Sequence, residues 1–259
     1  MRVIIYPHQM ASKGAKNLRD VFKSKGFQSL LVRPDGKYLP RKDDFLIGWG
    51  NSTHPTWARH AIKLNLKGIN NPDCIRTAVN KIDAFKAFQK AGVEHLPSTT
   101  ESVQAQGWLQ DGFWVVGRQK VEGSRAEGLL LFKTPEDFRP CPLYTKFCKS
   151  DREYRIYVVG DKVVDYLQKR RPNGAGPLEP IRSAALGWVY CRTDIKPLPD
   201  KAKEEAVKAV KALGLQFGGV DLLWGNKSGP RIIEVNTSPG IGGQGVEEIA
   251  DALVEILGE

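Results

Sequence analysis

Short apolar runs alternate with amphipathic stretches over the first third of the chain. The apolar runs, at 2–6, 27–32 and 45–48, have the length and composition of buried strands. Helical spacing follows Ser12, a residue type that caps helix N-termini, and recurs over residues 56–66. Alternation of strands and helices predicts a βαβ unit with a small parallel sheet.

A second pattern begins after the loop signal Asn70–Asp73. Apolar residues recur at helical spacing over residues 75–91, which predicts one helix ending at Gly92. A shorter helix is expected at 101–109, and the strand-like runs 113–116 and 129–132 follow it. We therefore expect a small α+β unit in the middle of the chain.

The last part of the chain is richer in strands. Gly160-Asp161 separates two β-rich runs and predicts a hairpin, and a longer loop joins a second pair of runs. The predicted strands are 154–159, 162–168, 181–190, 220–224 and 231–236. Amphipathic helices are expected at 199–213 and 246–257. This pattern again predicts an α+β unit.

Composition excludes several classes of protein. Among the 259 residues, no apolar run approaches the ~20 residues that cross a bilayer, and the N-terminal run is shorter than a signal sequence needs. The four cysteines form no C-x-x-C pair, and the four histidines have no zinc-type spacing. We expect a cytoplasmic protein without a disulfide framework.

The net charge of +10 is unevenly distributed. Residues 1–80 carry 14 Lys and Arg against 5 Asp and Glu, whereas residues 199–259 carry 6 against 10. The basic first third suits an acidic partner such as nucleic acid, an acidic peptide or a phosphorylated small molecule, and it equally suits a solvated basic face.

The strongest chemical signal lies in the second predicted hairpin. Glu234 and Asn236 alternate onto one face of their strand, and the turn can bring Asp221 onto the same face from the neighbouring strand. Two carboxylates and an amide oxygen form the hard ligand set that Mg²⁺ favours. The sequence thus predicts a metal site on this hairpin, with Mn²⁺ as a possible substitute.

The residues around this site resemble the C-terminal metal motif of the ATP-grasp superfamily. The pattern is Val-Asp-Leu-Leu followed by Ile-Ile-Glu-Val-Asn-Thr-Ser-Pro-Gly, and it is most similar to ribosomal-protein glutamate ligases and phage ATP-grasp proteins. The resemblance implies an α/β (α+β) ATP-grasp fold along the whole chain. It implies a pre-ATP-grasp domain (1–75), a central subdomain (76–140) and a C-terminal subdomain (141–259).

The resemblance also implies roles for individual residues. Asp221, Glu234 and Asn236 match the family's Mg²⁺ ligands, and Arg155 and Arg182 match arginines that stabilise the transferring phosphate. The residues expected to bind ATP are Lys81, Arg118, Lys120, Gly123, Ser124, Tyr144, Thr145, Lys146, Phe147 and Glu153.

Three segments account for most of that ATP site. Residues 123–128 are similar to the glycine-rich loop over the phosphates, and residues 144–147 to the hinge strand whose backbone holds adenine. The segment before the loop departs from the family's Val-Val-Lys-Pro, so that either Arg118 or Lys120 would replace the phosphate-binding lysine.

The family resemblance implies an ATP-dependent ligase. ATP would phosphorylate a substrate carboxylate, and an amine, or a thiol, would attack the acylphosphate. An anionic carboxylate and an amine acceptor are the expected partners, with nucleic acid as a possible carrier. The alternatives are a kinase on the same fold and a nucleic-acid-associated modification or binding protein.

Overall fold

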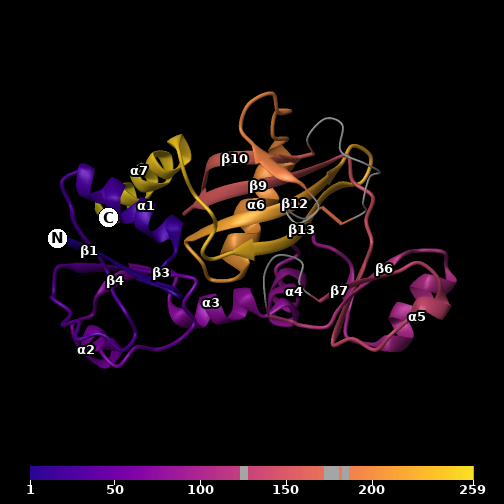
Figure 1. Ribbon diagram of the computed structural model, residues 1–259, viewed down its shortest axis with the longest axis horizontal. Coiled ribbons are helices and arrows are strands. Elements are labelled where there is room, and N and C mark those ends of the chain that lie inside the picture. Colours follow the sequence, from indigo (N-terminus) through magenta and orange to yellow (C-terminus); the bar gives the residue numbers. More distant parts are fainter. Residues whose placement is uncertain (123–127, 172–180, 183–186, 259) are drawn as a thin grey trace.

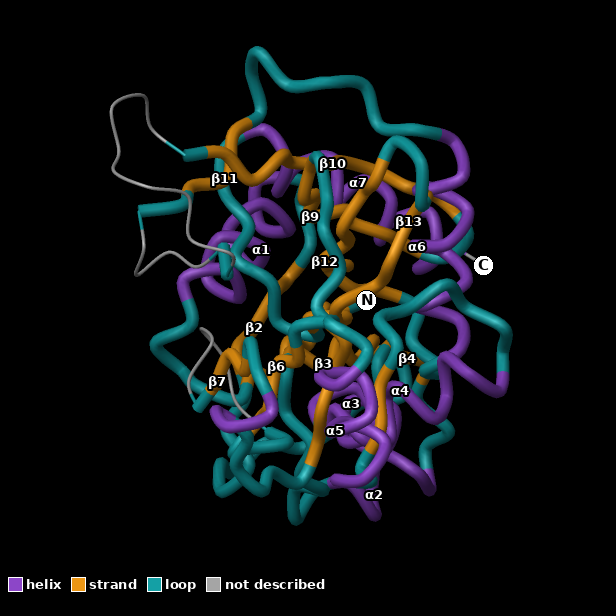
Figure 2. Tube along the Cα trace, turned by 90° about the vertical axis from the view of Figure 1, so that its right-hand side faces the viewer, coloured by secondary structure: helices purple, strands orange, loops and turns teal. Residues whose placement is uncertain are grey.

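The computed structural model describes residues 1–122, 128–171, 181–182 and 187–258 (Figures 1 and 2). These residues form a mixed α/β structure with three sheets. The fold class predicted from the sequence is confirmed, whereas the domain boundaries stay a prediction.

The first sheet has the order β2-β1-β3-β4, and every neighbouring pair is parallel. Its strands are β1 (Arg2–Pro7), β2 (Gln28–Leu31), β3 (Asp44–Trp49) and β4 (Lys67–Ile69). Helix α1 (Lys13–Ser24) connects β1 to β2, and Ser12 caps it by accepting a hydrogen bond from the Ala15 N–H. Helix α2 (Ala58–Lys63) connects β3 to β4. The predicted βαβ unit is confirmed.

The helix predicted over 75–91 is wrong in one respect, because two helices occupy this stretch. Helix α3 (Pro72–Val79) ends at Asn80, and α4 (Lys81–Lys90) begins directly after it. Asn80 has an extended backbone, and its side chain accepts hydrogen bonds from the N–H groups of Ile82 and Asp83. The apolar spacing runs through this cap, and therefore hides the break.

The second sheet is antiparallel, with the order β5-β8-β6-β7. Its strands are β5 (Ser98–Thr99), β6 (Val115–Arg118), β7 (Leu129–Phe132) and β8 (Leu143–Lys146). Helix α5 (Ser102–Gln110) packs against this sheet, and the 3₁₀ turn η1 (Pro135–Asp137) follows β7. The sequence pattern did not predict β5, which is two residues long.

The third sheet carries the predicted hairpins and has the order β11-β10-β9-β12-β13, antiparallel throughout. Its strands are β9 (Arg152–Val159), β10 (Lys162–Arg170), β11 (Val189–Cys191), β12 (Phe217–Gly225) and β13 (Gly229–Asn236). The strand predicted at 181–190 is confirmed only near its end, and residues 183–186 lie outside the described residues.

The two faces of the third sheet differ in what covers them. Helix α6 (Asp200–Ala212) packs with α3 and α4 on the face of Ile156, Val220 and Leu222. On the other face, α7 (Gln244–Gly258) and α1 cover only the end formed by Tyr157 and Val159 (Figure 1). The rest of this second face carries charged side chains.

A bulge fixes which residues of the last hairpin reach that second face. Asp221 pairs with Glu234, and the register then shifts so that Leu222 pairs with Ile232. Ile232 thus takes the fully buried core position, whereas Ile233 is only partly buried. Simple alternation with Glu234 and Asn236 predicts that Ile233 points into the core, and this one-residue insertion makes that prediction wrong.

No helix among the described residues is both long enough and apolar enough to cross a membrane.

Candidate functional site

Asp221 stands at the centre of the charged face, between strands β9 and β13. Its Cα pairs with Arg155 on one side and with Glu234 on the other. Arg155 donates two hydrogen bonds to the carboxylate, from Nε to Oδ1 at 2.8 Å and from Nη2 to Oδ2 at 2.7 Å. This two-point ion pair raises the pKa of Arg155 against the opposing effect of burial.

Two further side chains reach Asp221. Asn236 Nδ2 donates to Asp221 Oδ2 at 3.2 Å, and the Tyr190 hydroxyl donates to Asp221 Oδ1 at 3.4 Å. Burial, followed by the negative charge of Asp221, raises the pKa of Tyr190, so this hydroxyl stays protonated and can donate. The three predicted metal ligands therefore lie together on one hairpin.

Glu234 connects the hairpin to helix α4, which carries the predicted ATP-binding residue Lys81. Lys81, the first residue of α4, forms an ion pair with Glu234 Oε2 at 3.0 Å. Burial alone would raise the pKa of Glu234, but the positive charges of Lys81, Arg118 and Arg155 lower it to about 2. Glu234 is thus ionised at neutral pH.

A second ion pair lies beside this cluster. Lys169 Nζ contacts Glu153 Oε1 at 2.7 Å, and both side chains are largely buried. Burial raises the pKa of Glu153 although Lys169 opposes the shift. Lys169 is the first residue of the basic run Lys169-Arg170-Arg171, and its ion pair with Glu153 places it at the site.

Arg182 lies at the same end of the face as Glu153. Its Nη2 donates to the Ser150 carbonyl oxygen at 2.7 Å, and its guanidinium lies 5.1 Å from the centre of the Trp188 ring. Burial lowers the pKa of Arg182, whereas the charges of Glu153 and Asp151 favour its charged form.

The site holds more positive than negative charge. Among the described residues, five cations (Lys81, Arg118, Arg155, Lys169 and Arg182) interact with four carboxylates (Asp151, Glu153, Asp221 and Glu234), of which Asp151 is exposed. Arg118 Nε is buried and lacks a hydrogen-bond partner among the described residues. An anion of high charge, such as a polyphosphate, would balance this excess.

The donor set also fits a hard divalent cation. No group of three or more His, Cys, Asp or Glu side chains that could hold a metal was found in the part of the chain that the structure describes. Mg²⁺, however, commonly takes only one or two protein carboxylates together with substrate phosphates and water. Asp221, Glu234 and the Asn236 amide match that requirement.

The predicted hinge segment lies on β8 of the second sheet. The Tyr144 ring is fully buried, and its hydroxyl accepts from the Cys141 N–H at 2.6 Å. Thr145 is buried, while the N–H groups of Lys146 and Phe147 donate to the carbonyl oxygens of Pro97 and Trp114. A role of this segment in holding adenine stays a prediction.

The other predicted ATP-binding residues divide into two groups. Arg118, at the end of β6, is close enough to Glu234 to lower its pKa, whereas Lys120 is exposed. Gly123 and Ser124 lie outside the described residues. Arg118 therefore lies at the charged cluster, and which residue replaces the family's lysine stays a prediction.

Sequence reasoning missed Trp188 and Tyr190 as residues of the site. Strand β11 pairs Tyr190 directly with Lys169, which brings its ring to the charged face. The alternation within the predicted strand 181–190 could have placed both aromatics on one side, but nothing in the sequence showed which strand would lie beside them.

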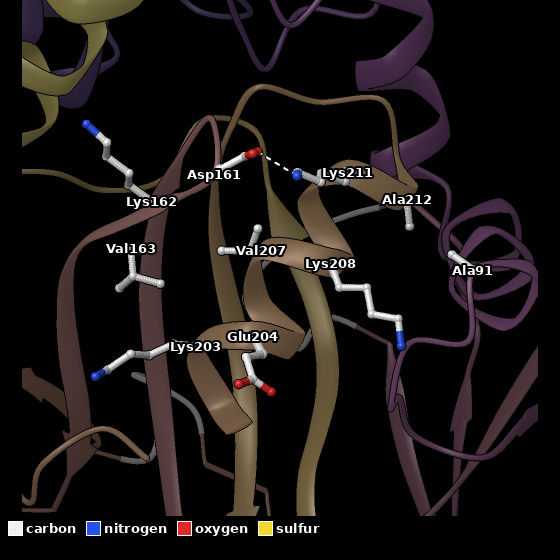
Figure 3. A pocket seen from close by; sticks show the side chains of 10 residues that line it. All are labelled: Ala91, Asp161, Lys162, Val163, Lys203, Glu204, Val207, Lys208, Lys211 and Ala212. Carbon is white, nitrogen blue, oxygen red and sulfur yellow. Dashed lines mark ion pairs between the residues drawn. The ribbon is translucent and has the colours of Figure 1, made fainter. Parts of the chain in front are cut away.

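A shallow depression of about 920 Å³ lies elsewhere (Figure 3). It is formed by α6 and the β9–β10 turn, on the sheet face opposite Asp221. Its lysines are paired locally, as Lys211 is with Asp161 at 2.7 Å (Figure 3). The depression is therefore separate from the charged cluster.

Part of the chain matches a known family of proteins. Residues 143–257 match the family described as RimK-like ATP-grasp domain. A probable alpha-L-glutamate ligase 1 from Shewanella sp. (strain MR-4) is 43% identical over 110 residues, which cover 40% of this chain and 33% of that protein. One from Shewanella pealeana is 26% identical over 221 residues, covering 77% of this chain and 46% of the relative. The chain thus spans about a third to a half of these relatives.

Solved structures extend the likeness to the whole chain. The ATP-grasp ligase PsnB, complexed with a phosphomimetic variant of a minimal precursor, Mg and ADP, has a TM-score of 0.69 at 11% identity and 98% coverage of both chains. D-alanyl-alanine synthetase A from Vibrio cholerae has a TM-score of 0.67 at 13% identity, covering 100% of this chain and 99% of that one. The predicted resemblance is confirmed: residues 143–257 match the RimK-like ATP-grasp domain family, and the chain as a whole has the ATP-grasp fold.

Proposed function

We propose that this protein is a Mg²⁺-dependent ligase that joins a carboxylate to an amine with hydrolysis of ATP to ADP and phosphate. A carboxylate oxygen of the substrate attacks the γ-phosphorus, and ADP leaves. The amine then attacks the acyl carbon, and phosphate leaves as the C–N bond forms. The excess of positive charge around the Asp221–Glu234 hairpin is the observation that supports this proposal.

Each charged residue has a task in this reaction. Asp221, Glu234 and Asn236 would hold Mg²⁺, which when bound would neutralise charge on the β- and γ-phosphates. Arg155 and Arg182 would stabilise the charge that develops on the transferring phosphoryl group. Lys81 and Arg118 would bind phosphate oxygens, and Glu153 would bind the nucleotide.

The identity of the substrates is a further part of the proposal. The curated relatives are named glutamate ligases, and several structural neighbours carry precursor peptides. An amino acid that supplies the amine and a peptide that supplies the carboxylate therefore suit this chain best. The basic residues 1–80 would attract an acidic peptide, and nucleic acid remains the alternative carrier. Because the reaction consumes ATP, we place the protein in the cytoplasm.

The test is release of ADP in the presence of candidate acids and amines, with mass spectrometry of the products. A new amide together with ADP supports a ligase. A stable phosphorylated product without an amide would instead support a kinase. Glu234→Ala is the matched inactive variant, and ADP release that is unchanged in this variant would contradict the assigned site.

A further inference from the structure

Two aromatic rings lie beneath the two arginines that we expect to act on the phosphate. The Arg155 guanidinium carbon is 4.4 Å from the centre of the Tyr190 ring, and that of Arg182 is 5.1 Å from the centre of the Trp188 ring. Lys169 Nζ is 5.3 Å from the Tyr190 ring. The rings are two residues apart, and Val189 between them is 48% exposed.

These contacts differ from the other contacts of the two arginines. Arg155 is otherwise held by Asp221, which is also a predicted metal ligand. A cation that binds the oxygens of Asp221 weakens that ion pair, whereas the face of Tyr190 does not compete with a metal. The ring can therefore keep Arg155 in place when its carboxylate partner turns to the metal.

Trp188 offers Arg182 a contact of the same kind. Trp188 is 8% exposed, and its indole N–H makes no hydrogen bond among the described residues. Its contribution to the site is therefore its ring. The Ser150 carbonyl oxygen holds one end of the guanidinium, and the ring limits its rotation.

We propose that Trp188 and Tyr190 are positioning residues, whose rings orient Arg182 and Arg155 toward the transferring phosphoryl group. This inference rests on the proposed function. It assigns neither ring to contact with the substrate, because each acts through one arginine. Removing a ring should therefore matter only while its own arginine is present.

Double-mutant cycles test this pairing. The readout is calorimetric binding of ADP with Mg²⁺ and aluminium fluoride, which imitates the transferring phosphoryl group and requires no knowledge of the substrates. Tyr190→Leu should weaken binding on the order of tenfold, and Tyr190→Phe by much less. In the Arg155→Ala background, Tyr190→Leu should have no further effect.

The second cycle tests Trp188 with Arg182 and uses Arg155 as the unrelated arginine. Trp188→Leu should weaken binding in the Arg155→Ala background but not in the Arg182→Ala background, and Trp188→Phe should restore most of the loss. Val189→Ala is the control, since this exposed side chain lies between the two rings and should leave binding unchanged.

The outcomes separate this inference from the proposed function. Wild-type protein that does not bind ADP with Mg²⁺ contradicts the proposed function itself. Wild-type protein that binds, with ring and arginine losses that add fully in both cycles, overturns the positioning role alone. If Trp188→Leu does not fold, as judged by its thermal unfolding, the Tyr190 arm decides the result by the same criterion.

Discussion

Two buried ionic networks in this molecule differ in charge balance. In the first sheet, Asp44 accepts hydrogen bonds from Arg2 Nε at 2.6 Å, Arg2 Nη2 at 2.7 Å, the Tyr38 hydroxyl and the Arg41 N–H. One carboxylate and one buried guanidinium neutralise each other there. The cluster around Asp221, in contrast, has more cations than carboxylates among the described residues, five against four.

The difference separates a network built for stability from one built for a ligand. A closed pair can hold the fold together, because each partner recovers in hydrogen bonds and attraction much of what burial costs it. Surplus buried cations destabilise the free protein and become favourable only when an anion arrives. The two networks should therefore respond in opposite ways to substitution, ligand and pH.

The largest contrast concerns activity against stability. Glu234→Ala should lower ADP formation at least about 100-fold, because it removes a predicted metal ligand. Asp44→Asn should leave the activity of the folded protein unchanged but lower the free energy of unfolding by about 3 kcal/mol. Urea unfolding and ADP release measured on both variants check this. Equal losses of activity in the two would contradict the separation.

Removing an arginine should change the free energy of unfolding in opposite directions in the two networks. Burial lowers the pKa of Arg118 although the charge of Glu234 opposes the shift, and the buried Nε has no hydrogen-bond partner among the described residues, so we expect its charge to be unfavourable where it lies. Arg118→Met should therefore raise the free energy of unfolding by about 1 kcal/mol while weakening ADP binding on the order of tenfold. Arg2→Met should lower the free energy of unfolding by about 3 kcal/mol, since it strands Asp44. Destabilisation by Arg118→Met would refute the idea of surplus charge.

These two networks also show how far the sequence alone could go. The predicted βαβ unit around β1 and the Asp221–Glu234 hairpin both followed from local patterns, since alternation and turns are encoded over a few residues. The assignment of Arg155 and Lys81 to family positions came from the resemblance. Their partners became visible only with the structure.

The sequence did not predict which strands pair with one another in the third sheet, or in which register. Lys169 faces Glu153 because β10 pairs with β9, and Tyr190 reaches Arg155 because β11 pairs with β10. No local pattern fixes such registers. The bulge at Asp221 and the cap at Asn80 likewise arise from single residues that interrupt an otherwise regular pattern.

An inorganic anion should distinguish the networks without any nucleotide. Tripolyphosphate at 100 times its dissociation constant should raise the free energy of unfolding by about 2.7 kcal/mol, because it binds only the folded site. Asp44→Asn should keep this increment, and the Arg118→Met and Arg155→Ala double variant should lose most of it. Thermal unfolding with and without tripolyphosphate measures it, and an equal increment in the double variant would place the anion elsewhere.

The smallest expected effect is in the pH dependence of stability, where the two networks have opposite slopes. Burial alone would raise the pKa of Asp44, but its hydrogen bonds from Arg2, Tyr38 and the Arg41 N–H lower it below the ordinary 3.8. Its stabilisation is thus complete above pH 3.8 and is lost as the pH falls through the lowered pKa.

Glu153 should behave in the reverse sense. Burial and the charge of Asp221 raise its pKa above the ordinary 4.5, although Lys169 and Arg182 oppose the shift. Above pH 4.5 the unfolded chain therefore releases a proton that the folded protein still holds, and stability falls as the pH rises toward the raised pKa.

Urea unfolding of wild type, Glu153→Gln and Asp44→Asn from pH 3 to 8 resolves both effects. The advantage of Glu153→Gln should grow above pH 4.5 and then level off, while the deficit of Asp44→Asn should shrink below pH 3.8. A Glu153→Gln profile parallel to that of wild type would mean that Lys169 fully compensates the burial of Glu153, and the site would then be as closed a network as the one around Asp44.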